Sequence, residues 1–400
     1  MRWYKEDSVC YKGNYGCCRL RFNLFLVIVI IVISVGRFYH RRRLENIDGS
    51  YDKSQINVET IDVVNRESRS GIRLKEILLW TSFYKDRYYG LSKYGRSGFI
   101  ERKCPINTCT LTNDRRKLTT ADAVVVHARN PDMKPLPKRQ NQKQIFVFFL
   151  HEAPPACFWN DRYTIPDDDK SSFNLTITYR YDSDIVRPGI GKLVKNDFPA
   201  NIPTISLKER TRSVVWVTSH CSTPGKRELY IQALSRYIDV DIYGKCGYLN
   251  CSYGDPCNKA FDKKYKFFIA AENAVCKDYV TEKVNKALSM NIVPIVYGGL
   301  NYKRYMPPNS YVDVMDFASP RELASYLKQV AVDEWKYREF FTWKASYHQV
   351  NVPIASTMCK LCEKLHNPIY HKLYPDIVQW WTENSCNNAF ITNLFFRGLV

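Results

Sequence analysis

The alternation of apolar and polar positions is most regular between residues 265 and 299. An apolar, aromatic run of strand length is followed by a polar loop, an amphipathic segment and a second apolar run. The amphipathic segment has helical spacing, with apolar side chains at Val280, Val284, Ala287 and Leu288. We predict a strand at residues 265–271, a loop at 272–278, a helix at 279–290 and a strand at 292–297. Such a unit is the building block of a parallel sheet.

Three polar residues of the predicted helix, Tyr279, Glu282 and Lys283, are spaced i, i+3 and i+4, so we expect them to share one face. They fall in the first turn, where free backbone N–H groups and the helix dipole favour an anion. A lysine beside a glutamate there suits a nucleotide diphosphate, with the lysine on the phosphates and the glutamate on the ribose hydroxyls. The alternative is a solvated helix face with an acidic first turn.

Similar units in the rest of the chain predict two α/β domains. Further buried elements are predicted as strands at residues 77–80, 123–126, 145–150, 175–179, 213–217 and 240–243, and a helix at 226–238. Apolar strands separated by polar or helical stretches are typical of parallel sheets. We expect domains at residues 73–207 and 208–370 that face a cleft, with ligand loops at the carboxyl ends of the strands. A tail at 371–400 is expected to pack across both domains.

The first 72 residues have a different character. Residues 1–21 are polar and partly basic, whereas residues 22–35 are almost entirely aliphatic. This span is short for a membrane crossing, which needs about 20 residues. We nevertheless favour an uncleaved signal anchor at 22–38, behind a cytosolic tail at 1–21 and ahead of a stem at 39–72. The alternative is a signal peptide cleaved after residue 36.

Charge and cysteine content narrow the classes of partner. The net charge is +19, but Lys and Arg are scattered and no zinc-finger or RNA-binding signature accompanies them, so we expect no nucleic-acid partner. Eleven of the 14 cysteines follow residue 100, and behind a membrane segment they predict disulfides. We also favour disulfides for Cys359 and Cys362, whose spacing alone suits a zinc or redox site. Sequons at Asn174 and Asn250 predict N-glycosylation of a lumenal catalytic part.

Candidate catalytic groups lie just beyond predicted strands. Glu152 follows strand 145–150 and precedes two prolines, where an α/β enzyme places a general base; a turn carboxylate is the plain alternative. Arg227 opens a predicted helix and suits a phosphate. Asp182 and Asp184 form an Asp-x-Asp pair that suits a metal, although residues 167–169 and 239–241 match this weak pattern too. No Walker, GxSxG, HExxH or GxGxxG motif is present in the sequence, which argues against ATPases, serine hydrolases, zincins and dinucleotide enzymes.

The stretch AENAVCKDYVTEKVNKAL, followed by VPIVYGG, resembles the signature of the α1,3-fucosyltransferases of glycosyltransferase family 10. Shorter matches cover residues 75–370 and read ADAVVVHARN, FFLHEAPP, FNLTITYRYDSDI, VVWVTSHCSTPGKRELY, VDIYGKCG and CKLCEKLH. The YGKCG stretch is more similar to invertebrate members. The resemblance implies a GT-B fold of two Rossmann-like domains, with GDP-fucose bound by the second domain and the acceptor by the first.

The resemblance also implies roles for matching residues. The family's general base falls on Glu152, and its phosphate-binding cations fall on Arg227 and Lys283. The other implied donor-binding residues are Glu282, which contacts the ribose, and Val217, Ser219, Glu272, Asn273 and Tyr279. Two departures affect the packing of the donor site: His220 stands where the family has Asn, and Ala271 where it has Phe.

The implied reaction is a single displacement with inversion. The base deprotonates the 3-hydroxyl of GlcNAc in a glycoprotein or glycolipid glycan, and that oxygen attacks the anomeric carbon of GDP-β-L-fucose. Because cations offset the charge on the leaving GDP, no metal is required, while stimulation by a divalent cation stays open. Two alternatives are a metal-dependent GT-A-type Golgi transferase using Asp182 and Asp184, and a non-catalytic glycan-binding Golgi protein.

The anchor, sequons and cysteines together predict a single-pass type II protein of the Golgi membrane with a lumenal catalytic part. The sequence does not specify the acceptor among the N-glycan core, LacNAc and LacdiNAc. It also leaves disulfide pairing and oligomeric state open.

Overall fold

The computed structural model describes residues 73–157, 164–250, 255–367 and 372–387. The predicted cytosolic tail, signal anchor and stem lie outside these ranges. Among the residues that are described, no helix combines the length and the apolar character needed to cross a membrane.

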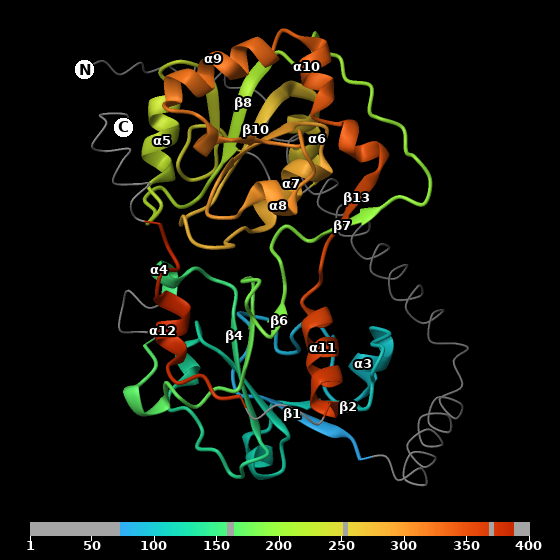
Figure 1. The fold of residues 1–400 in the computed structure, drawn as a ribbon, viewed down its shortest axis with the longest axis vertical. Coiled ribbons are helices and arrows are strands. Elements are labelled where there is room, and N and C mark those ends of the chain that lie inside the picture. Colours follow the sequence, from blue (N-terminus) through green and yellow to red (C-terminus); the bar gives the residue numbers. More distant parts are fainter. Residues whose placement is uncertain (1–72, 158–163, 251–254, 368–371, 388–400) are drawn as a thin grey trace, which may run out of the picture. The chain divides into compact units, whose positions relative to one another are not determined.

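Two parallel sheets organise the described chain (Figure 1). The first has the strand order β2-β1-β3-β4-β5-β6, with β1 (Lys75–Leu79), β2 (Cys109–Thr112), β3 (Ala123–His127), β4 (Ile145–Leu150), β5 (Leu175–Thr178) and β6 (Ile185–Val186). The second has the order β12-β11-β10-β8-β9, with β8 (Arg212–Val217), β9 (Val240–Tyr243), β10 (Tyr265–Ala271), β11 (Val293–Tyr297) and β12 (Val312–Asp313). A separate antiparallel pair joins β7 (Lys192–Lys195) to β13 (Tyr347–Val350). The predicted α/β class with parallel sheets is confirmed.

Helices connect and cover these strands. They are α3 (Ser97–Glu101), α4 (Pro154–Cys157), α5 (Arg227–Leu234), α6 (Asp255–Lys264), α7 (Glu282–Ser289), α8 (Tyr302–Tyr305), α9 (Pro320–Val330), α10 (Glu334–Glu339), α11 (Ala355–His366) and α12 (Ile377–Thr382). Short 3₁₀ helices occupy Arg115–Thr119, Pro131–Met133, Asp167–Asp169, Val314–Asp316 and Thr342–Ala345. Helices α5 and α9 pack side by side over the second sheet.

Each sheet is covered on both faces, because alternate strand residues enter different apolar clusters. In β10, Phe267 and Ile269 join the cluster that contains α5 and α9, whereas Phe268 and Ala270 join the one that contains α6 and α7. The first sheet divides in the same way between a cluster with α12 and a cluster with α11. Successive side chains of a strand point to opposite faces of the sheet, so a strand buried on both faces needs apolar residues at every position.

In each sheet, successive strands are first added on one side of the starting strand and then on its other side. After β2 the chain returns to the other side of β1, so the first reversal lies between β1 and β3. After β9 it returns to the other side of β8, so the second lies between β8 and β10. Loops at the carboxyl ends of strands diverge at such points and leave a crevice, which is where ligands bind in open α/β sheets.

The C-terminal segments return to the first sheet. Helix α11 packs against β1 and β6, although it falls within residues 208–370 that the sequence assigns to the second domain. Two disulfides, Cys104–Cys359 and Cys109–Cys362, hold it there. The predicted disulfide role of the CxxC pair is thus confirmed, with each cysteine bonded to the first sheet's β2 region.

The sequon at Asn174 does not fit the expected glycan. The residue is 5% exposed, and its Nδ2 donates to the Lys372 carbonyl at 3.0 Å. Its Oδ1 accepts hydrogen bonds from the Phe146 amide at 2.9 Å and from Arg139 at 2.7 Å. The atom that would carry the sugar is therefore buried and engaged, so this geometry does not favour a glycan, and glycosylation of Asn174 stays a prediction. Asn250 is exposed, and its glycosylation stays a prediction.

Candidate active site

The predicted general base lies at the first sheet's reversal. Glu152 follows β4, next to the loops that leave β1 and β3. Its Oε1 lies 3.0 Å from Nη1 of Arg129, which follows β3. The Tyr84 hydroxyl, from the loop after β1, donates a hydrogen bond to the same oxygen. The carboxylate is 22% exposed in its side chain, so it is held firmly yet reachable.

A cavity of about 450 Å³ brings this carboxylate together with residues that follow β10. Among the predicted site residues, Glu152, Tyr279 and Glu282 line it. Arg187 and Asn285 add a guanidinium and an amide to its wall. A space of this size, with a carboxylate on one side and groups from a second reversal on the other, suits two substrates.

Glu272 is the centre of the polar network at the second reversal. Its carboxylate is fully buried and accepts hydrogen bonds from the backbone N–H of Thr281 at 2.7 Å and from the Thr281 hydroxyl at 2.9 Å. The Lys283 Nζ lies 2.9 Å from Glu272 Oε2 and donates to the Thr281 hydroxyl at 2.6 Å. The anion at the start of α7 is therefore the protein's own carboxylate, and Lys283 is already paired with it.

The expected common face of Tyr279, Glu282 and Lys283 is wrong. Helix α7 begins at Glu282, because Asp278 has a left-handed φ of 60° and Thr281 is extended where Glu272 binds it. Tyr279 thus precedes the helix and is 2% exposed, with its ring 5.0 Å from that of Tyr179. Glu282 has an 80% exposed side chain and meets this network only at its edge, where its Oε1 lies 3.7 Å from the Lys283 Nζ.

The other predicted donor-binding residues, Arg227, Val217, Ser219 and Asn273, do not line the cavity. Arg227 is 3% exposed; it donates to the Ala271 carbonyl and to the Thr218 hydroxyl, while its Nε has no partner among the described residues. Its burial lowers the pKa of the guanidinium from its usual value. Val217 ends β8, Ser219 lies just beyond it, and the Asn273 carbonyl accepts from Gly225 at 2.8 Å.

The carboxylates of the Asp-x-Asp pair are engaged in separate structural contacts. Asp182 binds Arg180 at 2.6 Å and Lys277 at 3.0 Å. Asp184 is 6% exposed in its side chain, and its Oδ2 accepts hydrogen bonds from Thr176 and Tyr374. The two carboxylates therefore brace different segments, so the geometry does not favour the metal-site hypothesis.

Two histidines lie close to Glu152: His127 ends β3, and His151 directly precedes Glu152 and lines the same cavity. His127 is fully buried, and its ring packs edge-on against Phe83 and Tyr84. Burial lowers the pKa of His127 to about 4, and it lowers the pKa of His151 well below its usual value. Both imidazoles are therefore neutral at physiological pH.

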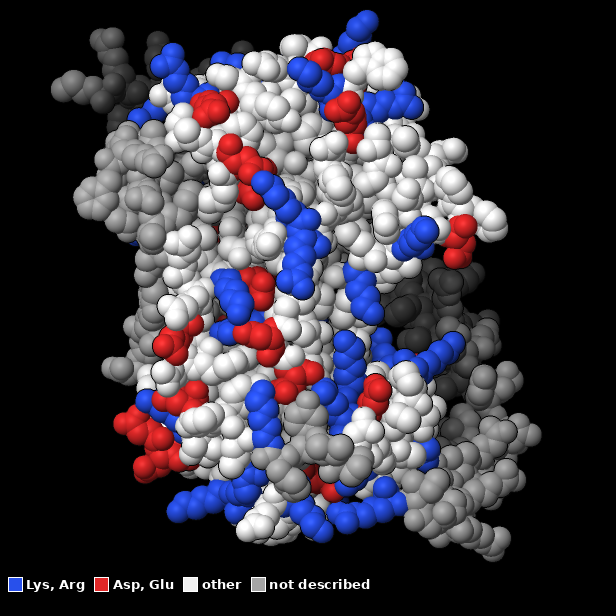
Figure 2. Space-filling model, viewed as in Figure 1, with Lys and Arg blue, Asp and Glu red and all other residues white. Residues whose placement is uncertain are grey.

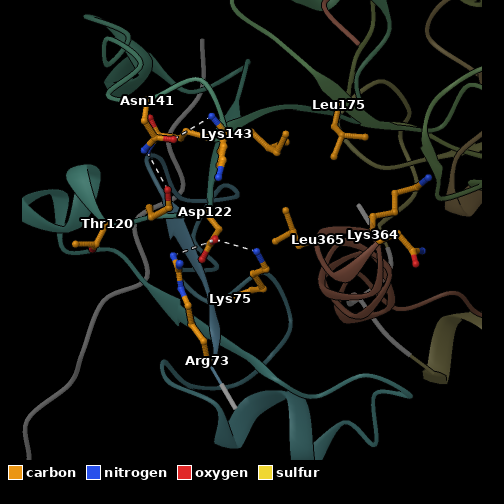
Figure 3. A pocket seen from close by; sticks show the side chains of 13 residues that line it. Arg73, Lys75, Thr120, Asp122, Asn141, Lys143, Leu175, Lys364 and Leu365 are labelled. Atoms are coloured by element: carbon orange, nitrogen blue, oxygen red, sulfur yellow. Dashed lines mark hydrogen bonds and ion pairs between the residues drawn. The ribbon is translucent and has the colours of Figure 1, made fainter. Parts of the chain in front are cut away.

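A second cavity, of about 560 Å³, lies at the opposite ends of the first sheet's strands (Figure 3). Asp122 lies there between Arg73 and Lys75, at 3.4 Å and 3.1 Å from their nitrogens. This second cavity is lined by residues at the amino ends of β1, β3, β4 and β5, and none of the predicted site residues lines it. Since ligands of parallel sheets bind at the carboxyl ends, this is not the candidate active site.

The surface charge gives no sign of a nucleic-acid interface on the face shown in Figure 2. Basic side chains are spread over that face with acidic ones between them, rather than gathered in one continuous patch. This arrangement matches the scattered Lys and Arg of the sequence.

Comparison with known proteins assigns the chain to a family. The family model "Fucosyltransferase, N-terminal" matches residues 73–189, and "Glycosyltransferase family 10 (fucosyltransferase) C-term" matches residues 207–380. Alpha-(1,3)-fucosyltransferase C of Drosophila melanogaster is 36% identical over 78% of this chain and 78% of that protein. The chain belongs to glycosyltransferase family 10. This fucosyltransferase family is the one that the sequence resembles.

Other members of glycosyltransferase family 10 are similar over comparable spans. Glycoprotein 3-alpha-L-fucosyltransferase A of Drosophila melanogaster is 34% identical over 79% of this chain and 62% of that protein. The human 3-galactosyl-N-acetylglucosaminide 4-alpha-L-fucosyltransferase FUT3 is 33% identical over 68% and 75%. A crystal structure titled as an alpha1,3-fucosyltransferase with GDP-fucose superposes with a TM-score of 0.50 at 17% identity, covering 75% of this chain and 93% of that one. At this identity the likeness shows the fold.

Three residues of the site were missed by reasoning from the sequence: Tyr84, Arg129 and Arg187. Tyr84 and Arg129 lie within five residues of the carboxyl ends of β1 and β3. Arg187 lines the cavity and donates from Nε to the Val352 carbonyl at 3.1 Å. Polar residues just beyond the carboxyl ends of adjacent parallel strands converge, and this rule could have found Tyr84 and Arg129. Applying it requires the strand order, which the sequence alone does not supply.

Proposed function

We propose that this family member moves L-fucose from GDP-β-L-fucose to the 3-hydroxyl of GlcNAc in glycoprotein or glycolipid glycans. The observation that carries the proposal is the position of Glu152, which faces Tyr279 and Glu282 across one cavity at the reversals of two parallel sheets. A base on one wall and a polar network on the other suit an acceptor hydroxyl and a nucleotide sugar. The names of the Drosophila relatives support fucose transfer to a 3-position.

In the proposed reaction Glu152 takes the proton of the acceptor hydroxyl as that oxygen bonds to the anomeric carbon. The bond from this carbon to the phosphate oxygen breaks, and GDP leaves with the electron pair. Attack from the side opposite GDP inverts the β-linkage to α. A general base held within reach of the nucleophile contributes roughly 10²- to 10⁴-fold to the rate.

The charge of the departing GDP is met by cations that have donors to spare. The Lys283 ammonium has three N–H bonds, of which Glu272 and Thr281 accept two. The Nε of Arg227 has no partner among the described residues. In this proposal both cations bind phosphate, Glu282 binds ribose, and Val217, Ser219, Glu272, Asn273 and Tyr279 shape the donor site. Preorganised cations at a leaving group replace the need for a metal.

The setting and the finer specificity are part of the proposal. We place the catalytic part in the Golgi lumen, on a type II anchor at residues 22–38, on the strength of the apolar run in the sequence. The acceptor stays open among the N-glycan core, LacNAc and LacdiNAc, since the relatives' names include both 3- and 4-linkages.

The test is transfer of fucose from GDP-fucose to a panel of GlcNAc-containing acceptors by the secreted lumenal part. We expect transfer that survives EDTA, and we expect Glu152→Gln to lower kcat by 10² or more while GDP affinity stays within twofold. Asp182→Asn is the matched control for the metal hypothesis and should keep its EDTA resistance. No transfer to any acceptor while GDP still binds would overturn the proposed function. Full activity of Glu152→Gln would remove Glu152 as the base.

A further inference from the structure

The two contacts of the Glu152 carboxylate fall on the same oxygen. The Tyr84 hydroxyl donates to Oε1, and Arg129 Nη1 lies 3.0 Å from Oε1. Among the described residues none donates to Oε2, and Glu152 lines the cavity of about 450 Å³. A carboxylate fixed through one oxygen has its other oxygen in a defined direction, with its lone pairs available.

We propose that Tyr84 and Arg129 are positioning residues that hold Glu152 by Oε1, so that Oε2 is the oxygen that receives the acceptor's proton. The inference rests on the proposed function and adds to it the two residues that orient the base. A base is effective only within hydrogen-bond reach and in the right direction, so the residues that fix its rotamer contribute to the rate without touching substrate.

The backbone around Tyr84 is built to hold that side chain in place. Tyr84 has a left-handed φ of 53°, a backbone conformation that is unfavourable for a non-glycine residue. The turn closes through Phe83 and Asp86, whose backbones exchange hydrogen bonds of 3.0 Å and 2.9 Å. The Asp86 carboxylate then accepts from the amides of Tyr88 and Gly90. A strained residue in a well-braced turn is a common feature of functional sites.

The surrounding groups leave Arg129 as the cation that contacts this carboxylate among the described residues. The titratable side chains whose charges interact with Glu152 are Tyr84, Arg129, Cys157, Tyr179 and Tyr279. Burial raises the pKa of the phenols and of the thiol, and the charge of Glu152 raises that of Tyr84 further. These groups therefore stay neutral near pH 7, and Tyr84 keeps the proton that it donates. His127 and His151 are neutral as well.

The test compares steady-state kinetics and rate–pH profiles of Tyr84→Phe, Arg129→Gln and Arg129→Lys. Losing one hydrogen bond to a charged group should lower kcat roughly 10- to 100-fold in Tyr84→Phe, with KM for GDP-fucose within twofold. In Arg129→Gln the acidic limb of the kcat profile should move to higher pH, because a cation that favours the ionised base is lost. Arg129→Lys should restore that limb. Tyr88→Phe, which removes a nearby phenol without contact to Glu152, is the control.

Each outcome separates this inference from the proposed function. If the wild-type protein transfers no fucose, the proposed function fails, and the positioning role of Tyr84 and Arg129 fails with it. If the wild type is active and both Tyr84→Phe and Arg129→Gln keep its kcat and pH profile, the positioning role is overturned while the function stands. A rise in acceptor KM at unchanged kcat would also overturn it, because the residues would then bind substrate. Tyr84 is 48% exposed, so its variant is expected to fold, and GDP binding with thermal unfolding checks that.

Discussion

At the scale of the residue, the site combines a buried, hydrogen-bonded carboxylate with two histidines that burial keeps neutral. Glu272 is fully buried and stays an acceptor for Thr281 and Lys283, whereas the two histidines close to Glu152 are kept neutral by the absence of water. The site therefore contains a carboxylate that accepts hydrogen bonds and, near Glu152, two imidazoles without charge.

The buried state of His127 predicts an acid-labile fold. Its pKa is about 4 in the folded chain and about 6.5 when unfolded, so between these values the unfolded chain binds a proton that the folded chain excludes. Stability present at neutral pH is therefore lost as the pH falls through this window. We expect urea unfolding at pH 5 to show a loss of about 2 kcal/mol from this group relative to pH 7.

The control for this pH effect is His127→Phe, whose ring suits the same aromatic contacts. Its free energy of unfolding should depend less on pH between 7 and 5 than that of the wild type. An identical pH slope in the two proteins would show that His127 does not titrate in this way.

At the scale of the element, the unit from β10 to β11 shows what periodicity predicts and what it misses. Both strands were predicted within one residue, because long buried runs have few alternatives. The helix start was placed three residues early, since spacing cannot reveal that Glu272 captures the Thr281 amide and that Asp278 turns the chain. Lys283 was correctly placed near the start of the helix, but its partner Glu272 is eleven residues earlier and joins it only in the fold.

The start of α7 gives a prediction about stability. Glu272→Gln keeps the shape of the side chain but removes the charge that compensates Lys283 and binds Thr281. Breaking one side of a buried, hydrogen-bonded pair should lower the free energy of unfolding by about 2–3 kcal/mol. The matched variant Glu282→Gln changes an 80% exposed carboxylate of the same helix and should cost less than about 0.5 kcal/mol. Equal urea midpoints for the two variants would contradict the structural role of Glu272.

At the scale of the whole molecule, the first sheet is completed by segments from the far end of the chain. Helices α11 and α12 supply part of its two cores, and Arg180 fixes α12 by donating to the Trp380 carbonyl at 2.7 Å and stacking 4.4 Å from its ring. The predicted boundary at residue 370 places α11 with the second domain, whereas α12 lies in the tail at 371–400 that is expected to pack across both domains. Helical periodicity locates α11 in the sequence but says nothing about which of two apolar sheets it covers.

The returning segments predict unequal effects for the replacement of two pairs of cysteines. Replacing Cys359 and Cys362 with serine releases bridges that span 255 and 253 residues and fasten α11. We expect a loss of roughly 2–5 kcal/mol and a lower midpoint of thermal unfolding. Replacing Cys221 and Cys246, whose bridge spans 25 residues within the second domain, is the control and should cost less. A larger loss in the control would contradict the idea that α11 closes the first sheet.

The return of α11 also sets an order of events during synthesis. A chain that emerges from its amino end makes β1 through β6 long before residues 355–382 exist, so both apolar faces of the first sheet stay partly uncovered until then. The strands of the second sheet lie between residues 212 and 313. The second sheet is therefore not separated from its own last elements by a whole intervening domain, as the first sheet is. The domain that is made first is therefore finished last, because its covering helix α12 and the Cys276–Cys386 disulfide use residues that are made after Cys359 and Cys362.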